Sequence, residues 1–143
     1  MKHMKKAFAL SGLLVLLTFA SALGQSDRQI IHIPFNFTVG EKTFSAGKYA
    51  IEPNKRDSDT VWVIRAKNNS EQAFVLTRPV YSTDTQNKFK LVFHRYDDLY
   101  FLTEIWTVGS STGRELQISD QEKALDKGLA MLRQDTVLVA GGN

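Results

Sequence analysis

The sequence contains no cysteine. Without cysteine the chain can form no disulfide, so the hydrophobic core has to hold the fold by itself. The absence also excludes thiol catalysis, thiolate metal sites and a lipid-modified cysteine behind a leader segment. Only three residues are proline, and no segment is of low complexity, so neither a linker nor a disordered region is indicated.

The N-terminus is the one long apolar segment. Three lysines lie among the first six residues, an uncharged apolar run follows over residues 7–20, and residues 21–24 are small. This order is typical of a secretory signal peptide, and the run is shorter than the roughly 18 to 20 residues that span a bilayer. We predict a signal peptide over residues 1–24, cleaved after Gly24 or after Ala22, and a periplasmic or secreted product without an integral membrane span.

Removal of that segment makes the chain formally neutral. The segment holds three of the 18 Lys and Arg residues and none of the 15 Asp and Glu residues, so residues 25–143 carry 15 of each sign. The basic pI of about 9.2 therefore comes from the leader. A neutral chain without a Lys/Arg run has no electrostatic footprint for nucleic acid. We predict one domain over residues 25–143 and no nucleic-acid partner.

Alternating apolar and polar residues predict a chain of short strands. Residues 31–39 alternate with the period of a strand, and Pro34 within them predicts an edge or a bulge, because proline cannot donate to a ladder. The best-defined hairpin joins residues 88–96 to residues 99–108 through Asp97 and Asp98. Further strands are expected at residues 42–44, 48–52, 60–66, 71–77 and 114–118, and a last strand at 136–140 stays open.

Near the C-terminus the pattern changes from strand to helix. Ser119 followed by Glu122 is a capping-box signature, and Leu125, Leu129 and Leu132 give a helical stripe. The predicted fold class is therefore all-β and mainly antiparallel: a small β barrel or two-sheet sandwich of seven or eight strands with one short C-terminal helix. A barrel is favoured, since closure removes the exposed edges of a disulfide-free domain.

The register of the main hairpin predicts which residues share a face. A two-residue or four-residue loop places Arg95 opposite Tyr100 and His94 opposite Phe101. One face then holds Phe89, Leu91, Phe93, Tyr100, Leu102 and Trp106, and the other holds Val92, Tyr96, Leu99, Phe101 and Ile105. This register also puts Glu104 on the first face and His94 on the second, whereas a shift by one residue would bring them to one face.

Three stretches together carry a resemblance. Residues 35–49 read F-x-F-x-V-G-x-K-x-F-x-A-G-x-Y, residues 91–106 read LVFHRYDDLYFLTEIW, and residues 113–117 read GRELQ. The chain thereby resembles a family of short exported bacterial proteins. It departs from the family pattern at Ser45, where relatives often have proline, and at Asp97, where glycine is common. The resemblance implies export and a β fold, and it supplies no catalytic residue.

Reactive side chains gather in the main hairpin. The candidate ligand-binding or structural cluster consists of His94, Arg95, Tyr96, Glu104 and Trp106. The favoured interpretation is structural: His94 is a half-buried sheet residue, and Glu104 is buried beside an arginine. Zinc sites use three or four convergent ligands, and the sequence holds no hydrolase, phosphate-binding or dinucleotide-binding motif. We therefore predict no metal site, no cofactor and no assigned catalytic residue.

Three functions remain open at this stage. The first is an exported non-catalytic β domain that binds an envelope or extracellular macromolecule or serves a structural role there. The second is a small barrel that carries an apolar ligand, as barrels of about eight strands can do. The third is a hydrolase or lyase with a carboxylate/His site, which the motifs favour least.

Overall fold

A computed structural model of the chain describes residues 28–56, 59–129 and 133–141. The described residues form ten strands and one helix. The strands are β1 (Gln29–Ile33), β2 (Phe37–Val39), β3 (Lys42–Phe44), β4 (Gly47–Pro53), β5 (Val61–Ala66), β6 (Gln72–Tyr81), β7 (Lys90–Tyr96), β8 (Leu99–Trp106), β9 (Thr112–Leu116) and β10 (Arg133–Ala140), and the helix is α1 (Asp120–Leu129). The predicted signal peptide lies outside the described residues.

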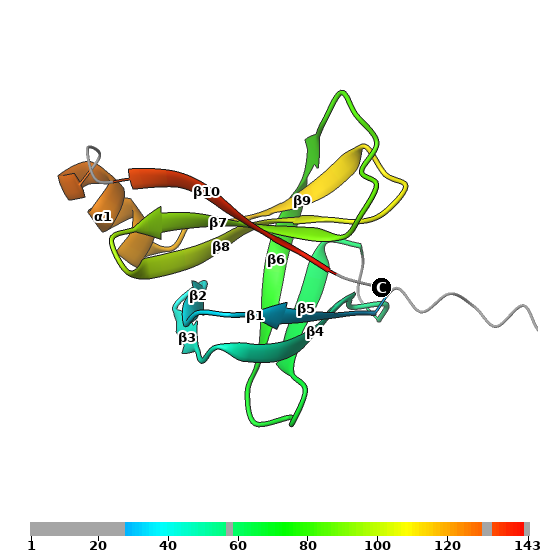
Figure 1. The fold of residues 1–143 in the computed structure, drawn as a ribbon, viewed down its shortest axis with the longest axis horizontal. Coiled ribbons are helices and arrows are strands. Elements are labelled where there is room, and N and C mark those ends of the chain that lie inside the picture. Colours follow the sequence, from blue (N-terminus) through cyan, green and yellow to red (C-terminus); the bar gives the residue numbers. More distant parts are fainter. Residues whose placement is uncertain (1–27, 57–58, 130–132, 142–143) are drawn as a thin grey trace, which may run out of the picture.

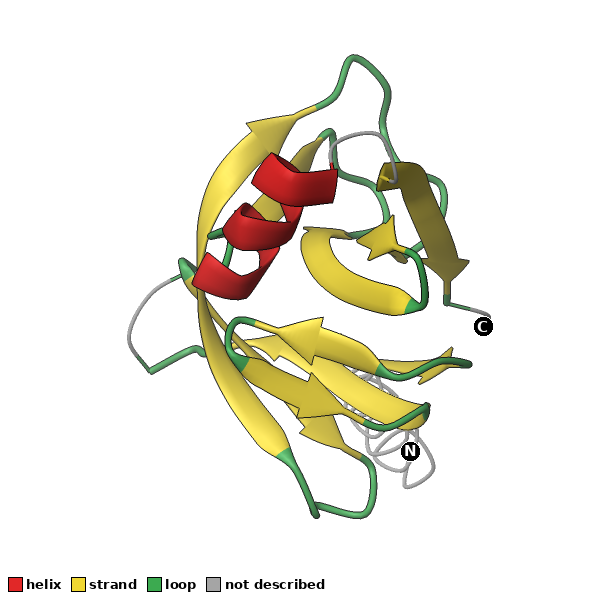
Figure 2. Ribbon diagram, turned by 90° about the vertical axis from the view of Figure 1, so that its left-hand side faces the viewer, coloured by secondary structure: helices red, strands yellow, loops and turns green. Residues whose placement is uncertain are grey.

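The strands form two sheets that share β6. The first half of β6 pairs with β5, from Gln72 to Leu76, and the second half pairs with β9, from Thr77 to Tyr81. Strands β1, β4 and β5 complete one sheet, and β9, β8, β7 and β10, with β2 and β3 beside β8, complete the other. Figure 1 shows the two sheets one above the other with β6 running between them, and Figure 2 shows the same layers from the side.

All of these pairings are antiparallel except the short parallel contact between β2 and β8, where Thr38 lies opposite Phe101. The predicted fold class, mostly antiparallel β with one short C-terminal helix, is confirmed. The preference for a barrel is wrong, because the sheet is not closed. Among the described strands β1 pairs with β4 alone, so it is an edge strand. Pro34 follows its last residue, so the edge position agrees with the prediction, but the single strand predicted over residues 31–39 is wrong, because it is divided into β1 and β2 at this proline.

The β7–β8 hairpin has the predicted turn. Tyr96 lies opposite Leu99, so the loop has two residues, and the predicted pairs of His94 with Phe101 and of Arg95 with Tyr100 are confirmed. Asp97 has a φ of 57°, a left-handed conformation that Asp tolerates and that explains why glycine is suited to this position.

A β-bulge corrects the predicted faces beyond this point. Val92 lies opposite Glu104 and Phe93 opposite Leu102, so Thr103 is an extra residue of β8. Its hydroxyl donates to the Val92 carbonyl oxygen at 3.0 Å. One extra residue exchanges the faces of everything that follows it on the strand. Ile105 therefore faces the core, and Glu104 and Trp106 project from the outer face, the reverse of the predicted arrangement.

The core lies between the two sheets and is rich in aromatic rings. Phe37, Phe44 and Tyr49 contact one another at ring-centroid distances of 5.0 to 5.8 Å, and Phe93 contacts Phe37 edge-on at 5.7 Å. Both Phe44 and Phe93 are fully buried. Edge-to-face contacts of this kind add to the hydrophobic stabilisation from burial of the rings. The space between the sheets is thus filled by side chains.

The C-terminal elements differ slightly from the prediction. α1 is described as far as Leu129, Arg133 at the predicted end of the helix already belongs to β10, and the strand left open at residues 136–140 exists as part of β10. β6 continues through Pro79 to Tyr81, beyond its predicted end at Thr77. In the part of the chain that the structure describes, no helix is long and apolar enough to cross a membrane.

Candidate functional site

Helix α1 begins beside the turn end of the β7–β8 hairpin (Figure 1). Ser119 precedes the helix, and its hydroxyl oxygen accepts a hydrogen bond from the Glu122 backbone N–H at 3.1 Å. This is the N-cap half of the predicted capping box. In the other half of such a box the Glu side chain turns back to the cap, whereas here the Glu122 carboxylate contacts β7.

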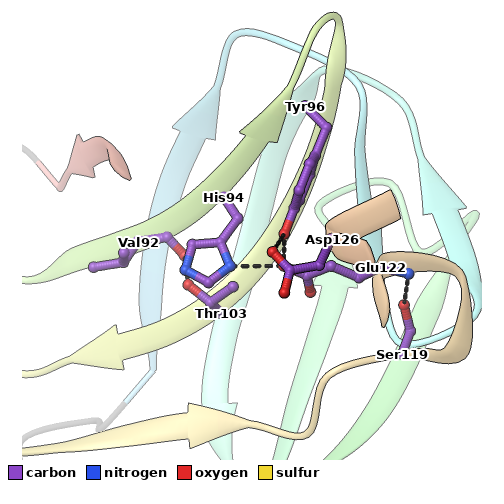
Figure 3. Close-up of polar contacts among 7 residues, drawn as sticks. All are labelled: Val92, His94, Tyr96, Thr103, Ser119, Glu122 and Asp126. Atoms are coloured by element: carbon purple, nitrogen blue, oxygen red, sulfur yellow. Dashed lines mark hydrogen bonds and ion pairs between the residues drawn. The ribbon is translucent and has the colours of Figure 1, made fainter. Parts of the chain in front are cut away.

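The Glu122 carboxylate joins the helix to the sheet. Its Oε1 lies 2.6 Å from Nδ1 of His94 and accepts a hydrogen bond from the Tyr96 hydroxyl at 3.2 Å (Figure 3). His94 and Tyr96 are two residues apart on β7 and point to the same, outer face. Asp126, one turn further along α1, has its Oδ1 3.5 Å from the same hydroxyl. We call His94, Tyr96, Glu122 and Asp126 the docking cluster.

Three of the four residues of the docking cluster are buried or half-buried, and Asp126 is exposed. The Glu122 side chain is 4% exposed and the His94 side chain 19% exposed. A carboxylate is costly to bury unless hydrogen bonds compensate, and here the His94 imidazole and the Tyr96 phenol supply them. With its oxygen engaged by two donors, the carboxylate is suited to fixing α1 on the outer face of the second sheet.

Arg95 points to the opposite face of β7. Its guanidinium lies 5.5 Å from the ring of Tyr100, and its Nε donates to the Asp97 carbonyl oxygen at 2.7 Å. Tyr100 in turn stacks on Phe35 with 3.9 Å between ring centroids. Arg95 therefore covers aromatic rings at the end of the core and is separated by the sheet from its neighbours His94 and Tyr96.

Glu104 and Trp106 form a third group, on the outer face of β8. The indole Nε1 of Trp106 donates to Glu104 Oε2 at 2.7 Å, and the Lys90 ammonium lies 5.4 Å from the Trp106 ring. The ring also lies directly over Gly113 of β9, where a Cβ atom would be 2.6 Å from it. The expected arginine partner of Glu104 is replaced by this indole.

The structure thus distributes the five predicted residues over three places. His94 and Tyr96 belong to the docking cluster, Arg95 lies at the end of the core, and Glu104 pairs with Trp106. Glu122, which sequence reasoning treated as a capping residue, is the main partner of His94. The only signal in the sequence that could have found it is a carboxylate on the buried side of an amphipathic helix.

One phenol has a strongly perturbed pKa. The Tyr49 hydroxyl donates to the Ser45 carbonyl oxygen and lies 3.5 Å from Glu71 Oε2. Burial, followed by the negative charge of Glu71 and its hydrogen bond, raises the pKa of Tyr49 to about 12. At neutral pH this phenol is protonated, so it is suited to donating a hydrogen bond and unsuited to acting as a base.

A groove with exposed apolar side chains and a partly polar lining lies along the outer side of β6. We call it the β6 groove, and its lining includes Phe74, Leu76, Leu116, Ile118 and Lys123. Three of the apolar side chains are well exposed: Phe74 at 60%, Leu76 at 63% and Ile118 at 45%. The hollow measures about 330 Å³ and continues into a neighbouring one of about 360 Å³ that shares Leu76 and Ile118. Exposed apolar side chains grouped around one hollow are typical of interaction sites.

The walls of the β6 groove come from two other elements. Gly40 and Glu41, in the turn between β2 and β3, form one wall, and Ser119 and Asp120 at the start of α1 form another. Glu41 Oε1 accepts a hydrogen bond from the Asp120 N–H at 3.2 Å and ties the two walls together. The docking of α1 and the shape of the groove are therefore coupled.

Within the described ranges, no three His, Asp or Glu side chains converge as a metal site would require. Compared with protein-family models, with curated protein sequences and with solved structures, the chain finds no match.

Proposed function

We propose that this chain is an exported, non-catalytic binding domain that recognises another macromolecule through the β6 groove. The observation that carries the proposal is the exposure of Phe74, Leu76 and Ile118 around a single hollow. Exposure of three large apolar side chains in one place is unfavourable for an isolated soluble domain, and a partner that covers them would remove that cost.

The state of the reactive side chains supports a non-catalytic role. A general acid or base has to reach a substrate, yet the Glu122 carboxylate is held by His94 and Tyr96 and is almost fully buried. Glu104 is hydrogen-bonded to an indole at 2.7 Å. Both carboxylates have structural partners, which is the simpler account of their positions.

The second function, a carrier of an apolar ligand, has less support. A barrel carrier needs a closed sheet around an open interior. Here the sheet is not closed, and aromatic side chains such as Phe37, Phe44 and Phe93 fill the space between the layers. The apolar surface that is open to a partner lies outside the sheet, in the β6 groove.

Export belongs to the same proposal and rests on the leader pattern alone. We expect cleavage after Gly24 or after Ala22. Intact-mass measurement of the protein from the producing cell tests this, and residues 1–20 still attached to the chain would refute it.

The binding role is tested with the full chain expressed in its producing cell. Native mass spectrometry of the purified protein identifies what remains bound to the wild type, to a Leu76→Ser/Ile118→Ser variant and to a Tyr81→Ser/Val108→Ser variant. Tyr81 and Val108 are also exposed, at 75% and 61%, but they lie outside the lining of the groove, which makes them a matched control.

We expect a stoichiometric macromolecular partner on the wild type and on the control variant, and its loss from the groove variant. Three results would contradict the proposal: a partner that the groove variant retains, no partner on the wild type, or a small molecule in place of a macromolecule.

A further inference from the structure

We propose that the β6 groove binds an extended polypeptide segment by strand addition to β6, with an acidic residue of that segment facing Lys42. This inference rests on the proposed function and specifies its partner as a flexible peptide segment. In strand addition, main-chain hydrogen bonds to an open sheet edge supply affinity and alternate side chains supply specificity.

Three hydrogen bonds establish which backbone groups of β6 face the open edge. Ala66 donates to the Glu71 carbonyl oxygen and Thr77 donates to the Thr60 carbonyl oxygen, both on the β5 side. Because backbone groups in a strand alternate between its two edges, the N–H and C=O of Phe74 point to the other side. The carbonyl oxygen of Gln72 points there as well, since it accepts a hydrogen bond from the Lys42 ammonium at 3.1 Å.

That edge is paired in its second half only. β9 pairs with β6 from Thr77 onward, and no described strand pairs with the same edge between Gln72 and Leu76. The open stretch runs along the β6 groove, because Phe74, Val75 and Leu76 line it. An incoming strand would therefore extend the sheet and also cover the exposed side chains of Phe74 and Leu76.

The walls of the groove indicate what kind of partner fits. Gly40 and Glu41 of the β2–β3 turn and Ser119 and Asp120 at the start of α1 line the groove beside the open edge, and the hydrogen bond between Glu41 and Asp120 joins them into one rim. A second folded domain, including another copy of this chain, would have to bring its own sheet edge past this rim. A single extended segment needs only the width of one strand, about 4.8 Å.

Lys42 supplies the charge complementarity. Its ammonium rests on the neutral carbonyl of Gln72, and no carboxylate contacts it among the described residues. Lysine on an open edge is also a common device against edge-to-edge aggregation. A peptide strand that bonds to Gln72 would displace the ammonium, which could then pair with an acidic side chain of the peptide.

The experiment uses the chain as purified from its producing cell and a displayed library of random ten-residue peptides. Selected peptides are synthesised, and their dissociation constants are measured by fluorescence polarisation. Each peptide is also made in two N-methylated forms, one methylated at the odd-numbered residues and the other at the even-numbered residues. N-methylation removes the hydrogen-bond donors of one strand edge and leaves the side chains in place. Peptide binding is also compared between the Phe74→Ala and Phe74→Pro variants of the protein. Both variants lack the phenyl ring, and only the proline variant also lacks the backbone N–H at the open edge of β6.

We expect selected peptides to alternate apolar residues and to carry an acidic residue near one end. N-methylation of the residues whose N–H groups face β6 should weaken binding at least tenfold, and N-methylation of the alternate residues should not. Phe74→Pro should weaken binding further than Phe74→Ala. Lys42→Ala should remove the preference for the acidic residue. Thermal melts of the two Phe74 variants check that both fold, since the N–H lost in the proline lies on the unpaired edge.

Two outcomes would overturn strand addition. If both N-methyl series bind equally and the two Phe74 variants are equal, the groove recognises side chains alone, and the proposed function survives without this mode. If no peptide prefers the wild type over Phe74→Pro, or if the wild type dimerises through this edge instead, the peptide proposal is wrong. The native mass spectrometry described above separately decides whether a macromolecular partner exists.

Discussion

Removal of the Glu122 carboxylate is the sharpest perturbation of this fold. Glu122→Ala leaves the His94 imidazole and the Tyr96 hydroxyl without their shared acceptor, at contacts of 2.6 and 3.2 Å in a mostly buried place. Each mostly buried donor that loses its acceptor costs about 1 to 3 kcal/mol. Alanine has a higher helix propensity than glutamate, which offsets roughly a few tenths of a kcal/mol of this loss.

We therefore expect the free energy of unfolding to fall by about 3 kcal/mol, which is a large part of the roughly 5 to 15 kcal/mol of a typical domain. The melting temperature should fall by roughly 10 °C for a chain of this length. Urea denaturation followed by tryptophan fluorescence measures the loss, and hydrogen exchange of the α1 amides shows whether the helix detaches first.

The matched control is Asp120→Ala in the first turn of the same helix. The Asp120 side chain is 93% exposed and its contact with Lys123 is 3.7 Å long, so this change should cost less than about 1 kcal/mol. A double-mutant cycle with His94→Phe should give a coupling energy above about 1 kcal/mol. Equal losses in the two alanine variants, or a coupling near zero, would refute the docking role of Glu122.

Three further predictions concern the core, the outer face and alkaline pH. Phe93→Ala should lower the free energy of unfolding by about 3 to 5 kcal/mol, because the ring is fully buried, and a melt close to wild type would show that the core lies elsewhere. Gly113→Ala should cost about 1 to 3 kcal/mol through the clash of the new Cβ with the Trp106 ring, and unchanged tryptophan fluorescence and stability would count against that stacking. Raising the pH from 10 to 12 should remove on the order of 1 kcal/mol of stability, because the folded-state pKa of Tyr49 is raised from 10.0 to about 12. Water in a separate surface pocket, lined by Ser45, Tyr49 and Glu71, screens part of the effect. Tyr49→Phe should abolish this pH dependence, and denaturation curves of both proteins across that range decide the point.

The sequence predicted local pairing well and long-range placement poorly. The turn at Asp97 and Asp98 and the pairs beside it follow from alternation and loop length, both of which are local. The bulge at Thr103 has no such signal, since no glycine marks it, and it reverses the faces of Glu104 and Trp106.

The partner of His94 was missed for a related reason. The capping pattern of Ser119 and Glu122 is explained by the hydrogen bond from the Glu122 backbone N–H to the Ser119 hydroxyl. Nothing in that pattern indicates that the Glu122 carboxylate contacts His94, 28 residues earlier in the chain. Local patterns also could not predict that the sheet does not close into a barrel. Closure depends on whether the first and last strands of the path meet, and strand patterns do not encode that distance.

The sharing of β6 between the two sheets also bears on how the domain loses its structure. Residues 72–76 hold β5 and residues 77–81 hold β9 on one continuous strand, so neither layer can separate without disturbing the strand that anchors the other. Motions that slide one layer over its neighbour, which are common where two sheets meet only through side chains, would have to bend this strand. We expect the layers to open as one cooperative unit, with amides of β5 and of β9 exchanging at the same free energy.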